Sequence, residues 1–317
     1  MSRSSPIGAL GPPGPPGTLG SEPGVARAGA SLRAQAQAKA SVLTEALPYI
    51  RRWAGKRVVV KAGGETVDKP GMLDSLARDV ALMRAVGLHP ILVHGGGRQI
   101  SQAMQASGVQ PVFIGGRRVT DAATIGVVKT VLLDINGRLV HALQRHGAHA
   151  FGVSGEEGGL LTTRKAAGPN GEDLGFVGEV ERVDTSVLDF SLGRDLIPVI
   201  APVGAGPDGP YNINADLAAS ALATAVRAQK LVLLTNIEGL YRDLGDRDSL
   251  ISETTVGQLE KLLGEGVLTE GMIPKITAVI EAMRAGVPQA HILDGRISHA
   301  LLLEVFTEEG VGTMVLP

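Results

Sequence analysis

The sequence predicts an α/β protein with a central, mainly parallel sheet that is covered by helices on both faces. Short apolar runs such as residues 57–60, 90–93 and 230–235 recur along the chain. Segments with helical periodicity separate these runs, and alternation of this kind is typical of a parallel sheet. The runs are almost continuous Val, Ile and Leu, which indicates strands that are buried on both faces.

The composition limits the classes of function. The 317 residues are enough for one or two domains, and 44% hydrophobic and 20% charged residues are typical of a globular protein. A net charge of -2 argues against nucleic-acid and anionic membrane partners. The absence of cysteine excludes disulfides, thiol catalysis and thiolate metal sites. No apolar run reaches the roughly 18 residues of a membrane span, so we expect a cytoplasmic protein.

The N-terminal region divides into two predicted segments. Residues 1–32 are rich in Gly, Pro, Ser and Ala, which predicts a disordered extension. Its serines and arginines faintly suggest a transit peptide, but an unstructured tail is the preferred interpretation. Residues 33–54 predict a helix, because apolar residues recur in it at helical spacing. This helix packs either on another subunit or on its own domain; the apolar residues are Val42, Leu43, Ala46, Leu47, Ile50 and Trp53.

Residues 55–317 predict a domain of alternating strands and helices. Each strand is assigned from a short apolar run, and each helix from a 3.6-residue apolar period with capping or glycine stop signals. Residues 160–183 contain short strand patterns around three glycines, which predicts a hairpin-rich insertion. The predicted strands are 57–60, 90–93, 148–153, 197–201, 230–235, 290–293 and 312–316, and the predicted helices are 72–86, 99–107, 122–145, 217–228, 255–263, 274–285 and 299–306.

Polar residues follow the carboxyl ends of several predicted strands. Lys61, Gly95 and Asn236 all fall at such an end. Ligands of open α/β sheets bind beyond this edge. Lys61 is followed by a Gly-Gly turn, and Gly95 begins a run of three glycines that leads into a helix. Glycines let backbone N–H groups approach an anion, and a helix N-terminus favours negative charge there. A flexible connection is the alternative, but its entropy cost favours a ligand.

A second polar group lies in residues 211–216, directly before an alanine-rich helix. Asn212, Asn214 and Asp216 alternate along this segment, and on an extended backbone they point to the same side. The structural alternative is a turn with a helix cap. Our hypothesis is that Asp216 orients two lysines across a phosphate site.

Lys275 follows Pro274 in the first turn of a predicted helix. The helix dipole disfavours a cation there by ~0.3–1 kcal/mol, so a facing phosphate explains this lysine better than a solvated surface position does.

Two common nucleotide motifs are excluded. There is no P-loop sequence, and the Gly-x-Gly-x-x-Gly match at residues 204–209 leads into an extended segment instead of a helix.

Several ordered motifs together resemble the amino acid kinase family, and within it the arginine-sensitive enzymes that phosphorylate N-acetyl-L-glutamate. The resemblance covers about residues 40–317 and implies a three-layer α/β/α sandwich, ATP and Mg²⁺, and the second step of arginine biosynthesis. It also implies that the N-terminal part of the domain binds the acylated amino acid and that the C-terminal part binds the nucleotide. The matching segments are residues 60–64, 93–97, 116–121, 211–216, 271–275, 291–296 and 310–314.

The resemblance also implies roles for individual residues. Lys61 and Lys275 would approach the transferring phosphoryl group, with Asp216 holding both lysines. The acceptor carboxylate needs no general base, because its pKa of ~4.3 leaves it ionised near neutral pH. No protein side chain is assigned as a metal ligand. The implied substrate-binding residues are Gly96, Gly97, Arg118, Asn212 and Asn214, and the implied nucleotide-binding residues are Gly63, Gly64, Thr235 and Asn236.

The same resemblance implies a homo-oligomer regulated by arginine. The helix at residues 33–54 would link dimers into a hexamer, and feedback inhibition by arginine would involve Tyr49, His291 and Glu304. Departures from the family pattern at Glu65, Arg117, Asn236 and residues 134–137 leave the substrate preference open. One alternative is a sibling kinase that acts on another acylated acidic amino acid.

A non-catalytic arginine-binding regulator is the other alternative. The presence of Lys61, Asp216 and Lys275 argues against it.

Overall fold

The computed structural model describes residues 23–242, 245–266, 268, 271–307 and 310–317. Within these residues an eight-stranded sheet has the order β14-β16-β15-β11-β1-β2-β8-β5. Neighbouring strands are parallel except for the β15–β16 pair. The strands are β1 (Arg57–Ala62), β2 (His89–His94), β5 (Ala150–Ser154), β8 (Ile197–Ala201), β11 (Lys230–Thr235), β14 (Glu253–Thr255), β15 (Ala290–Asp294) and β16 (Thr313–Leu316).

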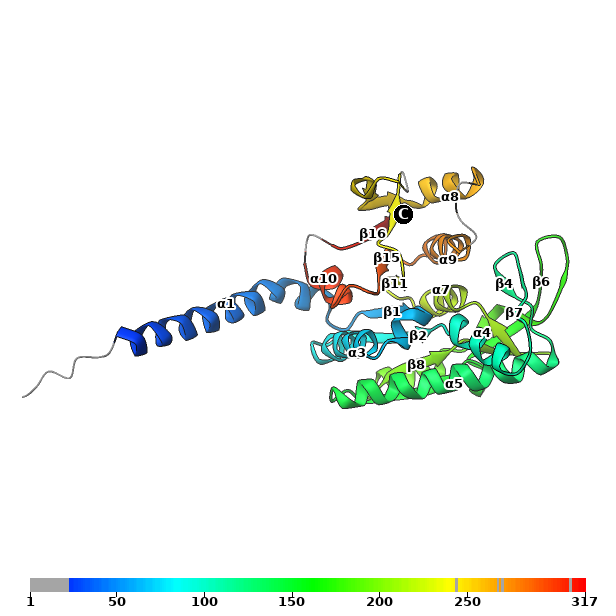
Figure 1. Ribbon diagram of the computed structural model, residues 1–317, viewed down its shortest axis with the longest axis horizontal. Helices are drawn as coiled ribbons and strands as arrows, with labels where there is room; N and C mark the ends of the chain where they lie inside the picture. The colour runs from blue at the N-terminus through cyan, green and yellow to red at the C-terminus, as the bar shows by residue number, and fades with distance from the viewer. Residues whose placement is uncertain (1–22, 243–244, 267, 269–270, 308–309) are drawn as a thin grey trace, which may run out of the picture. The chain divides into compact units, whose positions relative to one another are not determined.

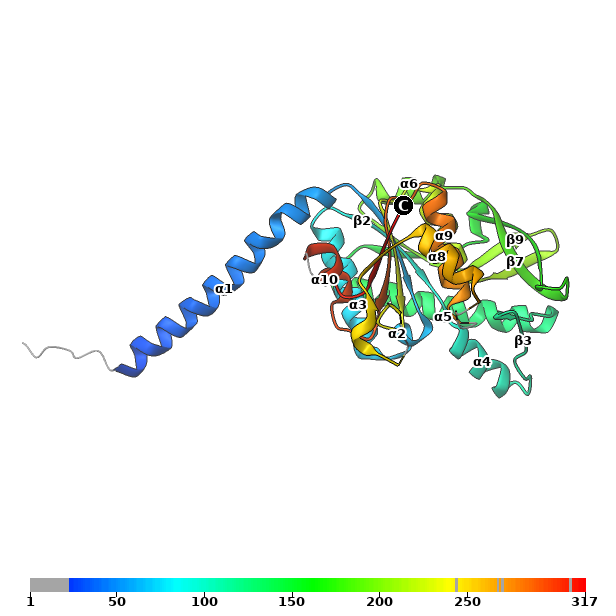
Figure 2. The same ribbon diagram turned by 90° about the horizontal axis from the view of Figure 1, so that it is seen from above.

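Helices cover both faces of this sheet, because alternate residues of each strand point to opposite sides. Val59 packs with one group of helices, while Val58 and Val60 pack with the other. Figure 2 shows α8 and α9 on one side of the sheet and α3 and α10 on the other. The first face carries α6 (Ser186–Leu192), α7 (Ala215–Ala225), α8 (Val256–Gly264) and α9 (Ile273–Arg284), and the second carries α3 (Pro70–Ala85), α5 (Ala122–Arg145) and α10 (Ala300–Phe306). The predicted three-layer α/β/α fold is therefore confirmed.

A smaller closed ring of four strands lies beside the main sheet, in the order β10-β7-β6-β9. It contains β6 (Leu161–Ala167) and β7 (Asp173–Val183), which confirms the predicted hairpin at residues 160–183. It also contains β9 (Val203–Gly206) and β10 (Gly209–Ile213), which the sequence predicted only as an extended segment. Figure 1 shows this region next to the hairpin of β3 (Phe113–Ile114) and β4 (Arg117–Arg118).

The carboxyl ends of β1 and β2 lead directly into helices. After β1 the chain enters α2 (Gly64–Asp68), a short helix that the sequence analysis interpreted only as a glycine turn. After β2 the chain enters α4 (Gly97–Ala106), as predicted. β1 lies between β2 and β11 in the sheet, so all three ends meet at one edge. The remaining short elements are η1 (Glu157–Gly159), β12 (Leu240–Tyr241), η2 (Arg247–Ser249) and β13 (Leu250–Ile251).

The prediction of disorder through residue 32 is wrong in part. Residues 1–22 lie outside the described residues, but α1 (Pro23–Trp53) begins ten residues before the predicted helix start. Alanine-rich sequence with a proline at the first helical position accounts for the earlier start. The chain divides into compact units at Met1–Leu47 and Pro48–Pro317 instead of after residue 54.

Trp53 explains this boundary, because it is buried in the core under β1 and α3. Of the two alternatives for the helix, packing on its own domain therefore holds for the part around Trp53.

Among the described helices, none combines the length and hydrophobicity that crossing a membrane requires.

Candidate active site

A buried ion pair joins β1 to α7 at the carboxyl edge of the sheet. Lys61 Nζ lies 2.7 Å from Asp216 Oδ1. The two side chains are only 8% and 7% exposed. Lys61 lies here because it is near the carboxyl end of β1, a central strand of the sheet. Asp216 lies here because it occupies the first turn of α7. An ion pair this deeply buried costs desolvation energy, which indicates a functional role as much as a structural one.

A second lysine completes the cluster from α9. Lys275 Nζ lies 3.7 Å from Asp216 Oδ2 and donates a hydrogen bond to Gly271 O at 3.0 Å. Burial acts to raise the pKa of Asp216, but Lys61 and Lys275 outweigh it and hold the pKa below its usual value. Burial lowers the pKa of Lys275, although Asp216 offsets part of this effect. The carboxylate thus stays ionised and holds two cations on one side of a cavity.

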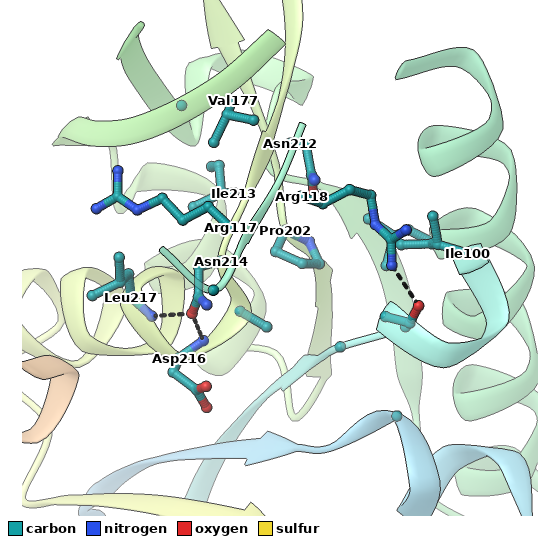
Figure 3. Close-up of a pocket in the computed structure, with 18 of the residues that line it drawn as sticks. Ile100, Arg117, Arg118, Val177, Pro202, Asn212, Ile213, Asn214, Asp216 and Leu217 are labelled. Atoms are coloured by element: carbon teal, nitrogen blue, oxygen red, sulfur yellow. Dashed lines mark hydrogen bonds between the residues drawn. The ribbon is translucent and has the colours of Figure 1, made fainter. Parts of the chain in front are cut away.

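Asn214, and not Asp216, is the N-cap of α7. Its Oδ1 accepts hydrogen bonds from the backbone N–H groups of Asp216 at 2.8 Å and Leu217 at 3.2 Å. Figure 3 shows both bonds, with the Asp216 carboxylate pointing away from the cap. The cap role considered for Asp216 is therefore wrong. Because Asn214 supplies the cap, both carboxylate oxygens of Asp216 are available to the lysines.

The glycine run after β2 forms one wall of the same cavity. A Cβ atom on Gly96 would lie 2.8 Å from Ile135 Cδ1, so a side chain there would require Ile135 of α5 to move. Gln99 Nε2 donates to Gly64 O at 2.9 Å and ties this loop to the start of α2. The two glycine segments that the sequence predicted to bind phosphate are thus held side by side.

Arg118 lies in β4 at the opposite wall. Its Nη2 donates to Gly97 O at 2.7 Å and to Ser101 Oγ at 2.8 Å, and its guanidinium lies 4.6 Å from the centre of the Phe113 ring. Burial lowers the pKa of Arg118, but arginine remains charged in proteins. A charged group fixed in this way suits a carboxylate ligand.

These groups enclose a cavity of about 220 Å³. Figure 3 shows the labelled polar residues arranged around it, with Arg118 directed toward α4. Lys275 reaches the cluster through its ion pair with Asp216. The predicted site residues that line the cavity are Lys61, Gly64, Gly96, Gly97, Arg118, Asn212, Asn214 and Asp216.

Three predicted nucleotide-binding residues do not line this cavity. Gly63 donates its N–H to Leu234 O at 3.1 Å, which joins the ends of β1 and β11. Thr235 Oγ1 accepts from Ile237 N at 2.9 Å, and Asn236 is exposed. All three lie at the carboxyl edge next to Lys61, so nucleotide binding there stays a prediction.

Sequence reasoning missed the apolar part of the cavity. Phe113, Val177, Pro202 and Ile213 line it together with the polar groups. Phe113 comes from the β3–β4 hairpin, Val177 and Ile213 come from the four-stranded ring, and Pro202 lies between β8 and β9. No polar signal distinguishes them in the sequence, and only the closure of the ring brings them together.

Three of the departures from the family pattern have structural partners. The Glu65 carboxylate accepts a hydrogen bond from Lys69 Nζ at 2.8 Å. This bond is the main reason why its pKa lies below the usual value. Arg117 points away from Arg118 (Figure 3) and pairs with Glu179 at 2.8 Å. Asn136, which lies on α5 within the departure at residues 134–137, contacts His94.

A second cavity of about 520 Å³ brings together the three residues predicted to bind arginine, Tyr49, His291 and Glu304. Glu304 Oε1 lies 2.6 Å from His291 Nδ1. Burial acts to raise the pKa of Glu304, but His291 and other groups hold it below its usual value.

Lys230 lines this second cavity and stacks on Trp53, with Nζ 4.6 Å from the ring centre. Burial lowers the pKa of Lys230 to about 8.

Comparison with known proteins extends these observations. The chain is 47% identical over 289 residues to an acetylglutamate kinase from Symbiobacterium thermophilum, covering 89% of this chain and 99% of that protein. It is 49% identical over 287 residues to an acetylglutamate kinase from Salinispora tropica, covering 89% and 97%.

Solved structures have the same fold. N-acetylglutamate synthase from Neisseria gonorrhoeae, complexed with coenzyme A and N-acetyl-glutamate, matches with a TM-score of 0.79 and 28% identity, covering 88% of this chain and 63% of that one. Carbamate kinase from Giardia matches with a TM-score of 0.59 at 17% identity, covering 83% and 99%, which supports the fold alone. The model of the amino acid kinase family matches residues 56–294. The chain therefore belongs to the amino acid kinase family.

Proposed function

We propose that the protein transfers the γ-phosphoryl group of ATP to the side-chain carboxylate of N-acetyl-L-glutamate, giving N-acetyl-L-glutamyl 5-phosphate and ADP. The observation that carries this proposal is the cluster of Lys61, Asp216 and Lys275, in which one buried carboxylate beside the cavity lies 2.7 and 3.7 Å from two lysine ammonium groups. Relatives with 44–49% identity over nearly the whole chain are named acetylglutamate kinase. We place the reaction at the second step of arginine biosynthesis.

The chemistry of the acceptor matches the groups that are present. A carboxylate oxygen of the substrate forms a bond to the γ-phosphorus while the bond from phosphorus to the β,γ-bridging oxygen breaks, and ADP leaves with that electron pair. The acceptor is already ionised, so no protein group has to remove a proton. The protein must instead align two anions and stabilise the charge on the phosphoryl oxygens. Lys61, Lys275 and the N–H groups of Gly96 and Gly97 are suited to this task.

The nucleotide and its metal ion fit the same edge. Gly95, Gly96 and Gly97 line the cavity, and glycine lets backbone N–H groups approach a phosphate closely at a helix N-terminus. We propose Mg²⁺ as the metal ion of the nucleotide, since proteins usually hold this ion through nucleotide phosphates and water. Bound Mg²⁺ would supply further neutralisation of the phosphate charge.

Arg118 would bind the α-carboxylate of the substrate, and the apolar residues beside it would contact the acetyl methyl group. We therefore expect Arg118→Leu to raise the KM for N-acetyl-L-glutamate by roughly 30-fold or more, because a charge-assisted pair is lost from a buried site, with little change in the KM for ATP. Steady-state kinetics on both substrates would measure this. Arg164→Leu is the matched control, since Arg164 pairs with Glu179 and does not line the cavity; equal effects of the two substitutions would contradict the assignment.

A panel of acceptors separates this function from its enzyme alternative. ADP release would be measured with N-acetyl derivatives of glutamate, aspartate and aminoadipate and with free glutamate. The proposal requires the highest kcat/KM for N-acetyl-L-glutamate. A higher value for the aminoadipate derivative would identify a sibling kinase, and no ADP release with any acceptor would favour a non-catalytic regulator.

We also propose that arginine inhibits the protein by binding the second cavity. An ionised Glu304 beside His291 offers a partner for a guanidinium group, and Tyr49 of α1 lines the same cavity. Val42 and Leu43 of α1 are 63% and 71% exposed, which supports docking of this helix on another subunit to link dimers into a hexamer. One solved relative, the N-acetylglutamate synthase, was crystallised with L-arginine.

The arginine proposal predicts that Glu304→Gln raises the half-inhibitory arginine concentration at least about tenfold, because a hydrogen bond between charged groups is worth ~1.5–3 kcal/mol. Inhibition curves at fixed substrate would measure the shift, and light scattering would give the oligomeric state. Glu260→Gln, an exposed glutamate paired with Arg284, is the control. A wild-type rate that arginine leaves unchanged, in a protein that is only dimeric, would refute this regulation.

A further inference from the structure

His94 lies at the end of β2, immediately before the glycine run, and its side chain is fully buried. It points to the same face of the sheet as Leu92, the face covered by α5. The transfer mechanism assigns no role to this imidazole. Asn136 of α5 reaches it, with Nδ2 3.2 Å from His94 Nε2. A Cβ atom on residue 152 would lie 1.9 Å from Asn136 Oδ1, so the glycine there makes room for this amide.

The hydrogen bonds fix the position of the imidazole proton. Asn136 Nδ2 donates to Val199 O at 2.9 Å. A carbonyl oxygen can only accept, so this bond sets the orientation of the amide. His94 Nε2 must then accept from the same Nδ2, and the single proton of the neutral ring lies on Nδ1. Nδ1 is 3.3 Å from Gly95 O and donates to it.

This last bond holds one peptide plane of the glycine run. The C=O of Gly95 and the N–H of Gly96 belong to the same planar trans peptide and point in opposite directions. Holding Gly95 O toward His94 therefore directs Gly96 N–H away from His94. Gly95 and Gly96 both line the active-site cavity, and Gly96 N donates to no other backbone group among the described residues. Because both positions are glycine, this peptide could rotate easily if the bond from His94 did not hold it.

We propose that His94 and Asn136 are positioning residues for phosphoryl transfer, which keep Gly96 N–H aimed at the transferring group by holding Gly95 O. The assignment rests on the proposed function, since Gly96 N–H acts only if a phosphoryl group passes through this cavity. The pair acts through the backbone and contacts no substrate. Gly96 N–H is the counterpart of a backbone hydrogen-bond donor in an oxyanion hole, and the orientation of such a donor must be set before the reaction.

The first test is His94→Leu, which removes the donor to Gly95 O at similar volume. We expect kcat to fall roughly 10- to 100-fold, within the range for loss of one such donor, while the KM values for ATP and N-acetyl-L-glutamate change less than about threefold. Gln144→Leu is the matched control. Gln144 Nε2 also donates from α5 to a strand carbonyl, that of Ala150 at 3.4 Å, and its loss should leave kcat unchanged.

The second test is Asn136→Asp, which is nearly isosteric and gives a readout that packing alone does not predict. The new carboxylate accepts a hydrogen bond from Nε2–H. A doubly protonated imidazole can still donate to Gly95 O, whereas a neutral ring keeps its proton on Nε2 and presents a lone pair to Gly95 O. The kcat of this variant should therefore fall as pH rises through the pKa of His94.

The wild type should show no such fall. Burial lowers the pKa of His94 to about 4, and the bond to Gly95 raises it only in part. His94 contacts Asn136 and Gly95, and its pKa has no charged group among its causes. Its titration thus lies below the pH range of an assay at pH 6–9.

Two outcomes would overturn the proposal. One is a folded His94→Leu variant whose kcat stays within about twofold of the wild type. The other is an Asn136→Asp pH profile parallel to that of the wild type, which would assign the pair a packing role only. Both tests compare variants with an active wild type, so failure of the proposed function would be recognised first, as absence of phosphorylated product from the wild type.

Discussion

Asp216→Asn is expected to lower kcat by about 10³-fold or more, at the upper end of the loss for a single preorganised charged group. The substitution keeps the shape of the side chain and removes the charge that holds Lys61 and Lys275. The two ammonium groups would then repel each other in a buried site. Neither would remain aimed at the phosphoryl group. The KM values should change far less than kcat, because these contacts strengthen in the transition state.

Unfolding must be separated from the catalytic effect. Removing one partner of a buried ion pair destabilises a protein by ~3–5 kcal/mol, so kcat should be measured well below the midpoint of thermal unfolding. Adding Lys61→Met to Asp216→Asn should recover stability without recovering activity. Asp121→Asn, at the N-cap of α5, is the matched control. Recovery of activity in the double variant would contradict the role of Asp216.

Lys275→Met is expected to lower kcat by roughly 10²- to 10³-fold, because one cation that stabilises the transition-state charge is lost. The cooperative fold should remain, since Lys275 is at the edge of the cluster with its side chain 19% exposed. Kinetics and thermal unfolding together would measure this. Lys261→Met, at an exposed position on α8, is the control, and an unchanged rate for Lys275→Met would exclude this residue from the mechanism.

The pH dependence of kcat provides an independent test of the role of Lys275. A lysine is charged below its pKa, and burial lowers the pKa of Lys275 from its usual 10.5. The wild-type kcat should therefore begin to fall on the alkaline side below that value. In Lys275→Arg this fall should disappear, because a guanidinium stays charged throughout the range. An alkaline fall that is identical in both proteins would assign it to another group.

The layered fold could be predicted because its signals are local. The apolar runs at residues 57–60 and 230–235 could form only buried strands, and the structure places them side by side in parallel. The closure of the four-stranded ring was missed because β9 and β10 are short and because β10 pairs with β7 across a long sequence separation, as Asn212 does with Val177. The start of α1 was misplaced because alanine-rich sequence between prolines and glycines gives conflicting signals.

The charged centre of the site was predicted, but its details were not. Lys275 is unusual for its local position in the first turn of a helix, whereas Lys61 and Asp216 were linked to it by their strand-end and pre-helix positions and by the family resemblance. The choice of Asn214 over Asp216 as cap depends on side-chain geometry that spacing does not determine. The contact of His94 with Asn136 could not be predicted, because it joins a strand to a helix 42 residues away through a gap left by Gly152.

Trapping of the acyl phosphate tests the central claim most directly. The wild-type protein would be incubated with MgATP, N-acetyl-L-glutamate and hydroxylamine, and the hydroxamate and ADP would be quantified together. We predict equal amounts of the two products, with the Asp216→Asn variant near background. ADP formation without hydroxamate, or no product from a correctly folded wild type, would contradict phosphoryl transfer to the carboxylate.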